Sequence, residues 1–324
     1  MKAFGRFMTI ALAASLAGGC ATTPSTPPER EPDQRSYAEF LADIPETDWQ
    51  EIAPEDLMVL EWNDRESGEP QRMVIRLMEL DYGAAWAANV RAMARRNYWR
   101  DGAIYRVIPG FVAQWGLVPD PDAEEEPADP DYLQTIPPGS YIAPLSGAAS
   151  PDQCRRSATA LSGVCDSYAP QVRFVDGWVF GSDGELMWPL FCRGTVGVAR
   201  GMAPAQGSGV ALYAVLANDH RRMDRNLGMV GRVVEGFDLL DELPGGTGDG
   251  GVYADSADVH AFTRVALAAD LPETERPRYR YLKTESASYT ALLDWVVQPN
   301  AFYTERYAAA DACRDIVPVT PIED

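Results

Sequence analysis

The chain has 324 residues, of which 46 % are hydrophobic, enough for one large domain or two modest ones with a substantial core. It contains 28 basic and 48 acidic residues, so its formal net charge at pH 7 is −20. Because binding to phosphate requires a basic face, this charge excludes a nucleic-acid-binding protein.

Residues 1–19 have the features of an export signal. Lys2 and Arg6 precede an apolar run over residues 7–16, which is too short to span a bilayer as a helix of the mature protein. The run ends in Leu-Ala-Gly-Gly-Cys20, which resembles the bacterial lipoprotein signal, whose cysteine is diacylated and becomes the new N-terminus. An alanine rather than an aspartate follows, which in such lipoproteins indicates the outer membrane. We therefore expect lipidation at Cys20 and a membrane-anchored protein facing the periplasm, with a plain secretory signal as the alternative.

Residues 20–50 are rich in Thr, Pro, Ser and Glu, a composition typical of a flexible tether between membrane and domain. Strands are predicted at residues 57–62 and 72–80, with a polar loop between them. A helix should follow at residues 84–97, because four apolar residues recur there at helical spacing and form one stripe: Trp86, Val90, Met93 and Ala94.

The segment 104–116 combines apolar residues with a single charge, that of Arg106. An Ile-Pro-Gly turn separates Arg106 from an alternating run over residues 111–115. A strand that breaks at the turn and then resumes would place Val112 and Gln114 on one face. An arginine in so apolar a setting should line a groove or be paired. The alternative is an arginine whose stem packs on the protein while its head reaches water.

Residues 117–190 contain two contrasting parts. Residues 119–131 combine dense negative charge with proline, which opposes regular structure. Further along is an aromatic patch that we expect to pack as a subdomain or a covering flap: Tyr168, Phe174, Trp178, Phe180 and Trp188. Because a structureless loop of this length is improbable in a compact domain, we expect the segment to be partly ordered.

Four cysteines remain after the predicted lipidation site, and an even number in an exported protein indicates two disulfides. Three pairings are possible. Cys154 and Cys165 lie within one stretch rich in small residues, so we predict that they pair with each other. This choice leaves Cys192–Cys313, a bridge that would tie a strand to the C-terminal tail.

Other kinds of site have little support in the sequence. A zinc site is improbable because there is no Cys-x-x-Cys spacing and the only histidines are His220 and His260, so we expect no metal. A serine hydrolase lacks the Gly-x-Ser-x-Gly turn and an evident acid partner for His220. The glycine-rich residues 245–251 lack the Gly-Lys-Ser/Thr of a phosphate-binding loop.

Toward the C-terminus, a flexible glycine-rich loop at residues 244–251 precedes an alternating run at residues 262–269 that is typical of a strand. Residues 271–324 form an extension, within which four residues have helical spacing and should pack on the preceding domain: Tyr289, Leu292, Leu293 and Val296.

Four segments follow one another along the chain: Ile-Tyr-Arg-Val-Ile-Pro-Gly-Phe-Val-Ala-Gln-Trp-Gly116, Gly-Thr-Val-Gly-Val-Ala-Arg200, Ser-Gly-Val-Ala-Leu-Tyr-Ala-Val215 and the run from Met223 to Leu240. They resemble the patterns F-H-R-V-I-P-G-F-M-x-Q-G-G, G-x-x-x-M-A, S-Q-F-F-I and F-G-x-V-x-x-G of the cyclophilin-type peptidyl-prolyl cis-trans isomerases. The resemblance covers roughly residues 55–116 and 190–268, and several motifs in one order make it specific.

This resemblance implies a mainly β fold: a closed antiparallel eight-stranded barrel capped by one or two helices. The domain would span residues 51–270, with residues 117–190 as an inserted subdomain, and the C-terminal extension would pack on the barrel. The implied activity is isomerisation of X-Pro bonds in proline-containing polypeptides, without a cofactor. Rotation about an amide bond meets a barrier of about 18–20 kcal/mol. The catalyst must therefore favour the twisted amide and needs no nucleophile.

The resemblance also implies the site residues. Arg106 has the position of the catalytic arginine, whose donors stabilise the twisted prolyl amide in an apolar pocket. The implied substrate-binding residues are Phe111, Val112, Gln114, Ala199, Ala211, Tyr213, Met223 and Leu227. Ala211 replaces a glutamine of the family, so a hydrogen bond worth about 0.5–1.5 kcal/mol is missing; Val112 replaces a methionine and Tyr105 a histidine.

The predicted function is therefore a peptidyl-prolyl isomerase that assists protein folding in the cell envelope. The alternative is a catalytically weakened module that binds proline peptides or proteins, or an envelope scaffold. The sequence leaves the client proteins and the oligomeric state open.

Overall fold

The computed structural model describes residues 35–120, 128–156, 161–299, 305–314 and 317–323. The predicted signal and Cys20 lie outside these residues. Among the helices that are described, none is long and apolar enough to cross a membrane.

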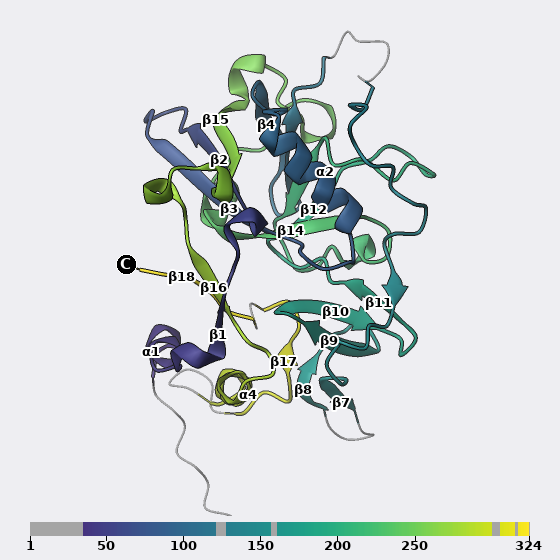
Figure 1. Ribbon diagram of the computed structural model, residues 1–324, viewed down its shortest axis with the longest axis vertical. Coiled ribbons are helices and arrows are strands. Elements are labelled where there is room, and N and C mark those ends of the chain that lie inside the picture. The colour runs from purple at the N-terminus through teal and green to yellow at the C-terminus, as the bar shows by residue number, and fades with distance from the viewer. Residues whose placement is uncertain (1–34, 121–127, 157–160, 300–304, 315–316, 324) are drawn as a thin grey trace, which may run out of the picture.

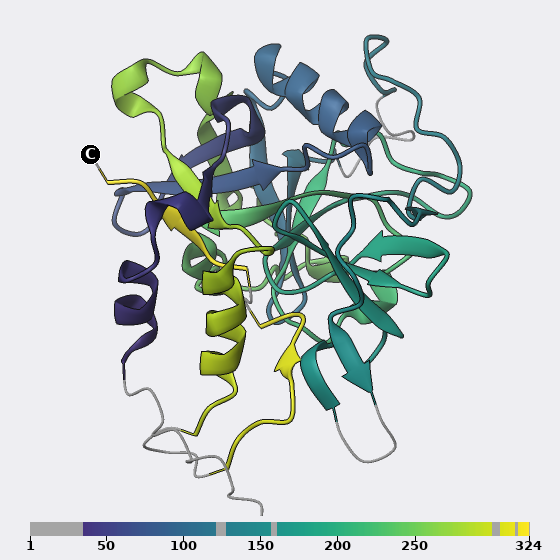
Figure 2. The same ribbon diagram turned by 60° about the horizontal axis from the view of Figure 1, so that its bottom comes forward.

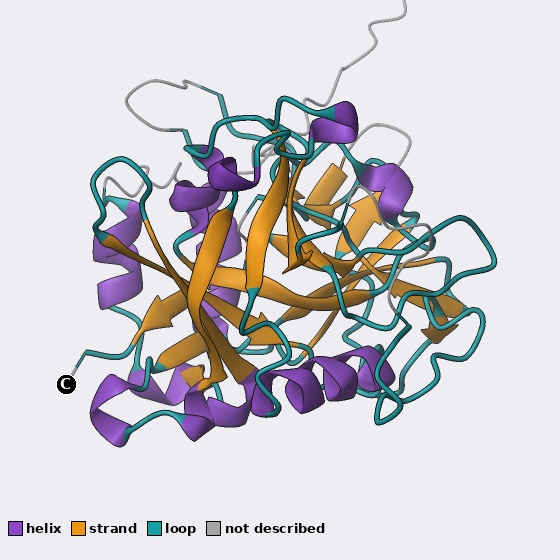
Figure 3. Cartoon of the chain, turned by 90° about the horizontal axis from the view of Figure 1, so that it is seen from above, coloured by secondary structure: helices purple, strands orange, loops and turns teal. Residues whose placement is uncertain are grey.

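Eight antiparallel strands close into a barrel in the order β12-β13-β5-β4-β15-β2-β3-β14 (Figure 1). The predicted mainly β fold with a closed eight-stranded barrel is confirmed, and Figure 3 shows strands at the centre with helices around them. The strands are β2 (Leu57–Asn63), β3 (Pro70–Leu77), β4 (Gly102–Ile108), β5 (Val112–Leu117), β12 (Thr195–Val198), β13 (Leu212–Val215), β14 (Met229–Glu235) and β15 (His260–Leu267).

Barrel strands such as β2 bury both of their faces. Met58, Leu60 and Trp62 belong to the main core cluster, whereas Leu57 and Val59 belong to a second cluster that includes tyrosines of the C-terminal extension. Side chains alternate across a strand, so the two sets point to opposite sides of the barrel wall. This double burial explains why β2 reads as a continuous apolar run.

One long helix, α2 (Ala84–Arg95), packs against the barrel, and its predicted apolar stripe is fully buried. The helix follows Gly83, whose φ of 68° is left-handed and whose missing Cβ would lie 2.9 Å from the Met229 carbonyl oxygen. A side chain is therefore excluded at this position. The Trp86 indole nitrogen donates to the Gly207 carbonyl over 2.8 Å, which ties the helix to the loop before β13.

The remaining helices are shorter: α1 (Tyr37–Ala42), α3 (Phe237–Asp241) and α4 (Ala287–Val296). Helix α1 lies within the residues that composition assigned to a tether. It begins at a capping box formed by Ser36 and Glu39, and its Phe40 ring lies 5.5 Å from the Trp295 ring of α4. Residues 35–50 are thus part of the folded domain, because their few apolar side chains have a surface to bury against.

The inserted segment forms an ordered subdomain beside the barrel, as Figure 1 shows. Its main sheet has the order β6-β11-β10-β9. A separate hairpin of β7 and β8 forms a three-stranded sheet with β17 of the C-terminal extension, in the order β17-β8-β7. The bounds are β6 (Ala143–Pro144), β7 (Cys154–Arg156), β8 (Leu161–Cys165), β9 (Gln171–Val175), β10 (Trp178–Ser182), β11 (Leu186–Pro189) and β17 (Ala310–Asp311). Four of the five predicted aromatic residues are buried; the exception is Tyr168, which is 64 % exposed.

The C-terminal extension packs against both the barrel and the insertion. Strand β16 (Tyr279–Leu282) lies between β1 (Trp49–Glu51) and β18 (Val319–Pro321), while β17 pairs in parallel with β8 of the insertion. Figure 2 shows α4 beside α1 at the same end of the molecule. The structure contains both predicted disulfides, Cys154–Cys165 within the insertion and Cys192–Cys313 between the loop after β11 and the extension.

Replacing Cys192 and Cys313 by alanine should lower the free energy of unfolding more than replacing Cys154 and Cys165. The two bridges span 121 and 11 residues. The chain-entropy model then gives about 5 kcal/mol for the long bridge and about 3 kcal/mol for the short one. Urea unfolding of the two double variants measures the difference, and a larger loss for the short bridge would contradict this expectation.

Candidate active site

Arg106 lies on β4 at the outer face of the barrel and is half-buried. A β-bulge at this point interrupts the register between β4 and β5 and leaves Arg106 opposite Gln114. The guanidinium donates from Nη1 to the Gln114 side-chain oxygen over 2.9 Å and from Nε to the Gly250 carbonyl over 2.6 Å. Among the described residues no carboxylate pairs with it and Nη2 has no partner, so the group is held in place while its charge is not neutralised.

The glycine-rich loop after α3 is what holds Arg106 from the second side. The Gly246 amide donates to the Val107 carbonyl over 2.9 Å, and Val252 forms an isolated β-bridge with Arg106. Gly251 has a φ of 84°, and a Cβ there would lie 2.4 Å from the Ile108 side chain, so only glycine allows this approach. The composition of residues 244–251 predicts a flexible loop, whereas the loop packs closely against β4; its density of glycine is the sequence signal for such close backbone packing.

Tyr105 fixes the orientation of the Gln114 amide. The Gln114 nitrogen donates to the Tyr105 hydroxyl over 2.6 Å, which turns the amide oxygen toward Arg106. Tyr105 is buried and was noted in the sequence only as a departure from the family pattern. A hydrogen-bonded chain therefore runs from Tyr105 through Gln114 to Arg106.

A single row of cross-strand neighbours connects Arg106 to an apolar surface. Arg106 is paired with Gln114, Gln114 with Tyr213, and Tyr213 with Gly197, across four adjacent strands. The Tyr213 ring lies over Gly197, where a Cβ would come within 2.3 Å of it. Burial raises the pKa of the Tyr213 hydroxyl well above its usual range, so the residue stays neutral.

The apolar residues of the predicted site belong to one cluster beside this row. Val112 and Tyr213 are buried within it, and four partly buried residues pack against it: Phe111, Ala199, Met223 and Leu227. Ala211 lies at its edge, where its carbonyl accepts a hydrogen bond from the Ala199 amide over 3.0 Å. The sequence-predicted residues are thus brought together on one face of the barrel.

His220 is a neighbour of this surface that the sequence analysis missed. Its ring meets the Phe111 ring edge-on at 4.6 Å, and Nε2 lies 2.7 Å from the Gly110 carbonyl oxygen. The nearby short helix Arg221–Met223 brings Met223 into the cluster, and the Leu227 amide donates to the Met223 carbonyl over 3.2 Å. We name residues 220–227 the rim loop.

The sequence matches the family model for cyclophilin-type peptidyl-prolyl cis-trans isomerases over residues 70–261, more than half of the chain. The chain belongs to this family. It is therefore an isomerase of the cyclophilin type, a family that binds proline-containing peptides.

The fold of this cyclophilin is similar to that of a solved cyclophilin structure. The crystal structure of cyclophilin AquaCyp293 from Hirschia baltica is 17 % identical, with a TM-score of 0.59, covering 90 % of this chain and 100 % of that one. A cyclophilin-type isomerase from Cryptosporidium parvum, crystallised in the presence of the dipeptide Ala-Pro, is 12 % identical with a TM-score of 0.38, covering 67 % and 98 %. No curated protein matches the sequence.

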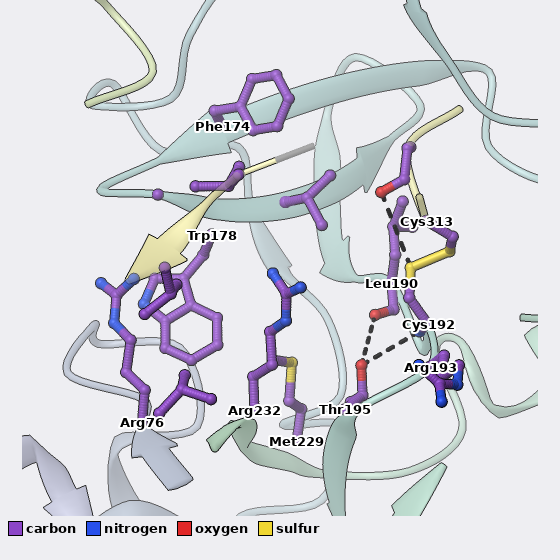
Figure 4. Close-up of a pocket in the computed structure, with 16 residues that line it drawn as sticks. Arg76, Phe174, Trp178, Leu190, Cys192, Arg193, Thr195, Met229, Arg232 and Cys313 are labelled. Carbon is purple, nitrogen blue, oxygen red and sulfur yellow. Dashed lines mark hydrogen bonds between the residues drawn. A yellow bond between two sulfur atoms is a disulfide. The ribbon is translucent and has the colours of Figure 1, made fainter. Parts of the chain in front are cut away.

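A cavity elsewhere in this cyclophilin is separate from the Arg106 surface. It has a volume of about 40 Å³ and lies between β14, the insertion and the C-terminal tail. Figure 4 shows Arg76, Trp178, Arg232 and the Cys192–Cys313 bridge around it. None of the predicted substrate-binding residues lines this cavity. In the described part of the chain, no group of three or more His, Cys, Asp or Glu residues could hold a metal ion.

Tyr105→Phe should lower kcat/KM by about threefold to tenfold, because the Gln114 amide loses the acceptor that orients it toward Arg106. The assay is the rate of cis–trans exchange of a proline peptide. Tyr279→Phe is the matched control, since the Tyr279 hydroxyl is also buried and donates to the Glu235 carboxylate, outside the apolar cluster of the site. An equal effect of both variants would mean that Tyr105 acts only through stability.

Proposed function

We propose that this cyclophilin accelerates protein folding by isomerising X-Pro bonds, with Arg106 stabilising the twisted prolyl amide. The observation that carries this proposal is a guanidinium held at Nε and Nη1, with Nη2 unengaged among the described residues, beside an apolar cluster. The proline ring of a substrate can pack against the apolar cluster. The Nη2 atom of Arg106 can then donate a hydrogen bond to the prolyl nitrogen.

The chemistry requires discrimination between two states of one amide. In the planar ground state the nitrogen lone pair is delocalised, whereas in the twisted state it becomes a hydrogen-bond acceptor. A donor that bonds only to the twisted state lowers the barrier without stabilising the ground state. A hydrogen bond from a charged donor is worth about 1.5–3 kcal/mol, which corresponds to roughly tenfold to a hundredfold in rate.

The surroundings of Arg106 support this role. The Gly250 and Gln114 oxygens orient the guanidinium without cancelling its charge, because both are neutral acceptors. Donors that are positioned before the reaction need no reorganisation when the amide twists. Phe111 of the adjacent turn is partly exposed and supplies apolar surface that suits a proline ring, while Val112 is buried beneath this surface.

Arg106→Ala should lower kcat/KM for an Ala-Pro or Phe-Pro peptide by at least about a hundredfold, equivalent to about 2.7 kcal/mol of transition-state stabilisation. The measurement is exchange-rate NMR on the soluble domain from about residue 30, with thermal melts beside it. Arg100→Ala is a matched control, because Arg100 is exposed in the turn before β4 and its substitution removes the same positive charge.

Three results would change this assignment. If the wild type binds the peptide without turnover, the protein is a proline-binding module. If Arg106→Ala unfolds the domain, Arg106 has a structural role. If Arg100→Ala lowers the rate equally, the effect is one of overall charge.

We further propose that the protein works in the cell envelope, anchored to the outer membrane through acyl chains on Cys20 and facing the periplasm. The signal-like residues 1–19 and the alanine after Cys20 support this location. Multiple acyl chains anchor firmly, because each buried CH₂ contributes about 0.8 kcal/mol.

Cys20→Ala should abolish incorporation of labelled palmitate and release the protein from the membrane fraction of a bacterial host. Ala21→Asp should keep the label but move the protein from the outer to the inner membrane fraction. Membrane association that survives Cys20→Ala would contradict the lipid anchor, and outer-membrane sorting that survives Ala21→Asp would contradict the sorting assignment.

A further inference from the structure

The rim loop is attached to the insertion through a buried arginine. Arg221 begins the short helix that ends at Met223, and its side chain is only 2 % exposed. Its guanidinium lies between two carboxylates, Asp224 of the rim loop and Asp166 of the insertion. Nε donates to Asp224 Oδ2 over 3.0 Å, Nη2 donates to Asp166 Oδ1 over 3.2 Å, and Nη1 donates to Asp166 Oδ2.

Both carboxylates are themselves fixed. Asp166 Oδ1 accepts hydrogen bonds from the backbone amides of Tyr168 and Ala169 over 2.8 Å and 2.7 Å. Asp224 Oδ1 accepts from the Phe191 amide over 2.8 Å. The Tyr168 ring covers the guanidinium at 5.1 Å. A buried cluster of this kind has one preferred geometry, because every charged group is satisfied only when all partners are in place.

The position of this cluster sets the position of the substrate-binding residues of the rim loop. The amides of Asn226 and Leu227 both donate to the Met223 carbonyl, over 3.0 Å and 3.2 Å, so hydrogen bonds within the loop connect these residues to the short helix. Arg225 has a left-handed φ of 64° and lies over the Trp188 ring of the insertion at 4.7 Å. The rim loop is therefore held by the insertion at two points.

We propose that Asp166 is a positioning residue for the isomerase: through Arg221 it places Met223 and Leu227 against the proline-binding surface, so that the insertion sets substrate affinity. This inference rests on the proposed function for the identity of the substrate, a proline-containing peptide. Arg106 is held by β5 and the glycine-rich loop instead, so the chemical step does not depend on Asp166. Apolar contacts act on ground and transition states alike, and their loss therefore raises KM rather than lowering kcat.

A second buried arginine provides a matched control. Arg76 of β3 also joins the barrel to the insertion, because it donates to Glu79 and, over 2.8 Å, to the Asp176 carbonyl, and it lies over the Trp178 ring at 4.5 Å. None of these contacts involves the rim loop. Asp166→Asn and Glu79→Gln each remove one carboxylate charge from a buried arginine that anchors the insertion.

The experiment measures kcat, KM and melting temperature of the full-length protein and both variants with one proline peptide. Asp166→Asn retains an oxygen for the Tyr168 and Ala169 amides but directs an amide toward Arg221, so KM should rise by about tenfold while kcat changes less than about twofold. Glu79→Gln should lower the melting temperature without changing KM. In ¹³C-methyl methionine NMR spectra, the Met223 signal should shift in Asp166→Asn alone.

Tyr168→Ala is the milder second variant, since Tyr168 is exposed and its removal is compatible with folding; it should raise KM by about twofold to threefold. The proposal is overturned if Asp166→Asn and Tyr168→Ala fold and leave KM and the Met223 signal unchanged. It is also overturned if Glu79→Gln raises KM as much as Asp166→Asn. If the wild type shows no turnover, the isomerase function is refuted, but the positioning role of Asp166 can still be tested. The dissociation constant of the same peptide is then measured in place of KM.

Discussion

Burial of the Arg221 guanidinium between Asp166 and Asp224 is the interaction on which the arrangement of this protein depends. It joins the insertion to the rim loop, and Nη1 of Arg221 also lies 3.6 Å from the Cys313 sulfur of the C-terminal disulfide. Taking three charged groups out of water is costly, and removing one partner from such a group typically costs about 3–5 kcal/mol. The guanidinium of Arg221 therefore contacts the insertion, the rim loop and the C-terminal extension at one buried point.

A second buried arginine joins the added segments to the barrel. Arg76 is buried between the rings of Trp178 and Tyr281, at 4.5 Å and 4.1 Å, so it contacts the insertion on one side and the C-terminal extension on the other. A planar guanidinium can stack on two aromatic faces while its edge donates hydrogen bonds, which an ammonium group cannot do. The added segments are thus attached by specific polar anchors as well as by apolar packing.

The structural arginines differ from Arg106 in one property that matters for catalysis. Arg221 and Arg76 contact carboxylates, which neutralise their charge, whereas the partners of Arg106 are a carbonyl and an amide oxygen. A guanidinium that donates only to neutral acceptors is held in one orientation, while its positive charge is not neutralised and can act on a nearby substrate. This contrast assigns attachment to the paired arginines and leaves Arg106 able to act on a substrate amide.

The sequence by itself determined the family, because several motifs occur in the family's order, and the family in turn implied the barrel and the candidate site residues. The segment 104–116 shows the strand, the turn and the single arginine, and the ordered motifs indicate the remaining strands. Cys154 and Cys165 are close in sequence, so the shorter disulfide could be predicted from spacing, and the longer one followed from it.

Only the tertiary structure decided which distant groups meet. Gly250 lies 144 residues from Arg106 in the chain, and Asp166 lies 55 residues from Arg221, so no periodicity relates them. The folded structure of residues 35–50 could likewise not be predicted. These residues include few apolar side chains, which become structured only because another element, here α4, provides a surface on which to bury them. Backbone carbonyls and buried ion pairs take their roles from the folded neighbours, and residue type alone does not reveal those neighbours.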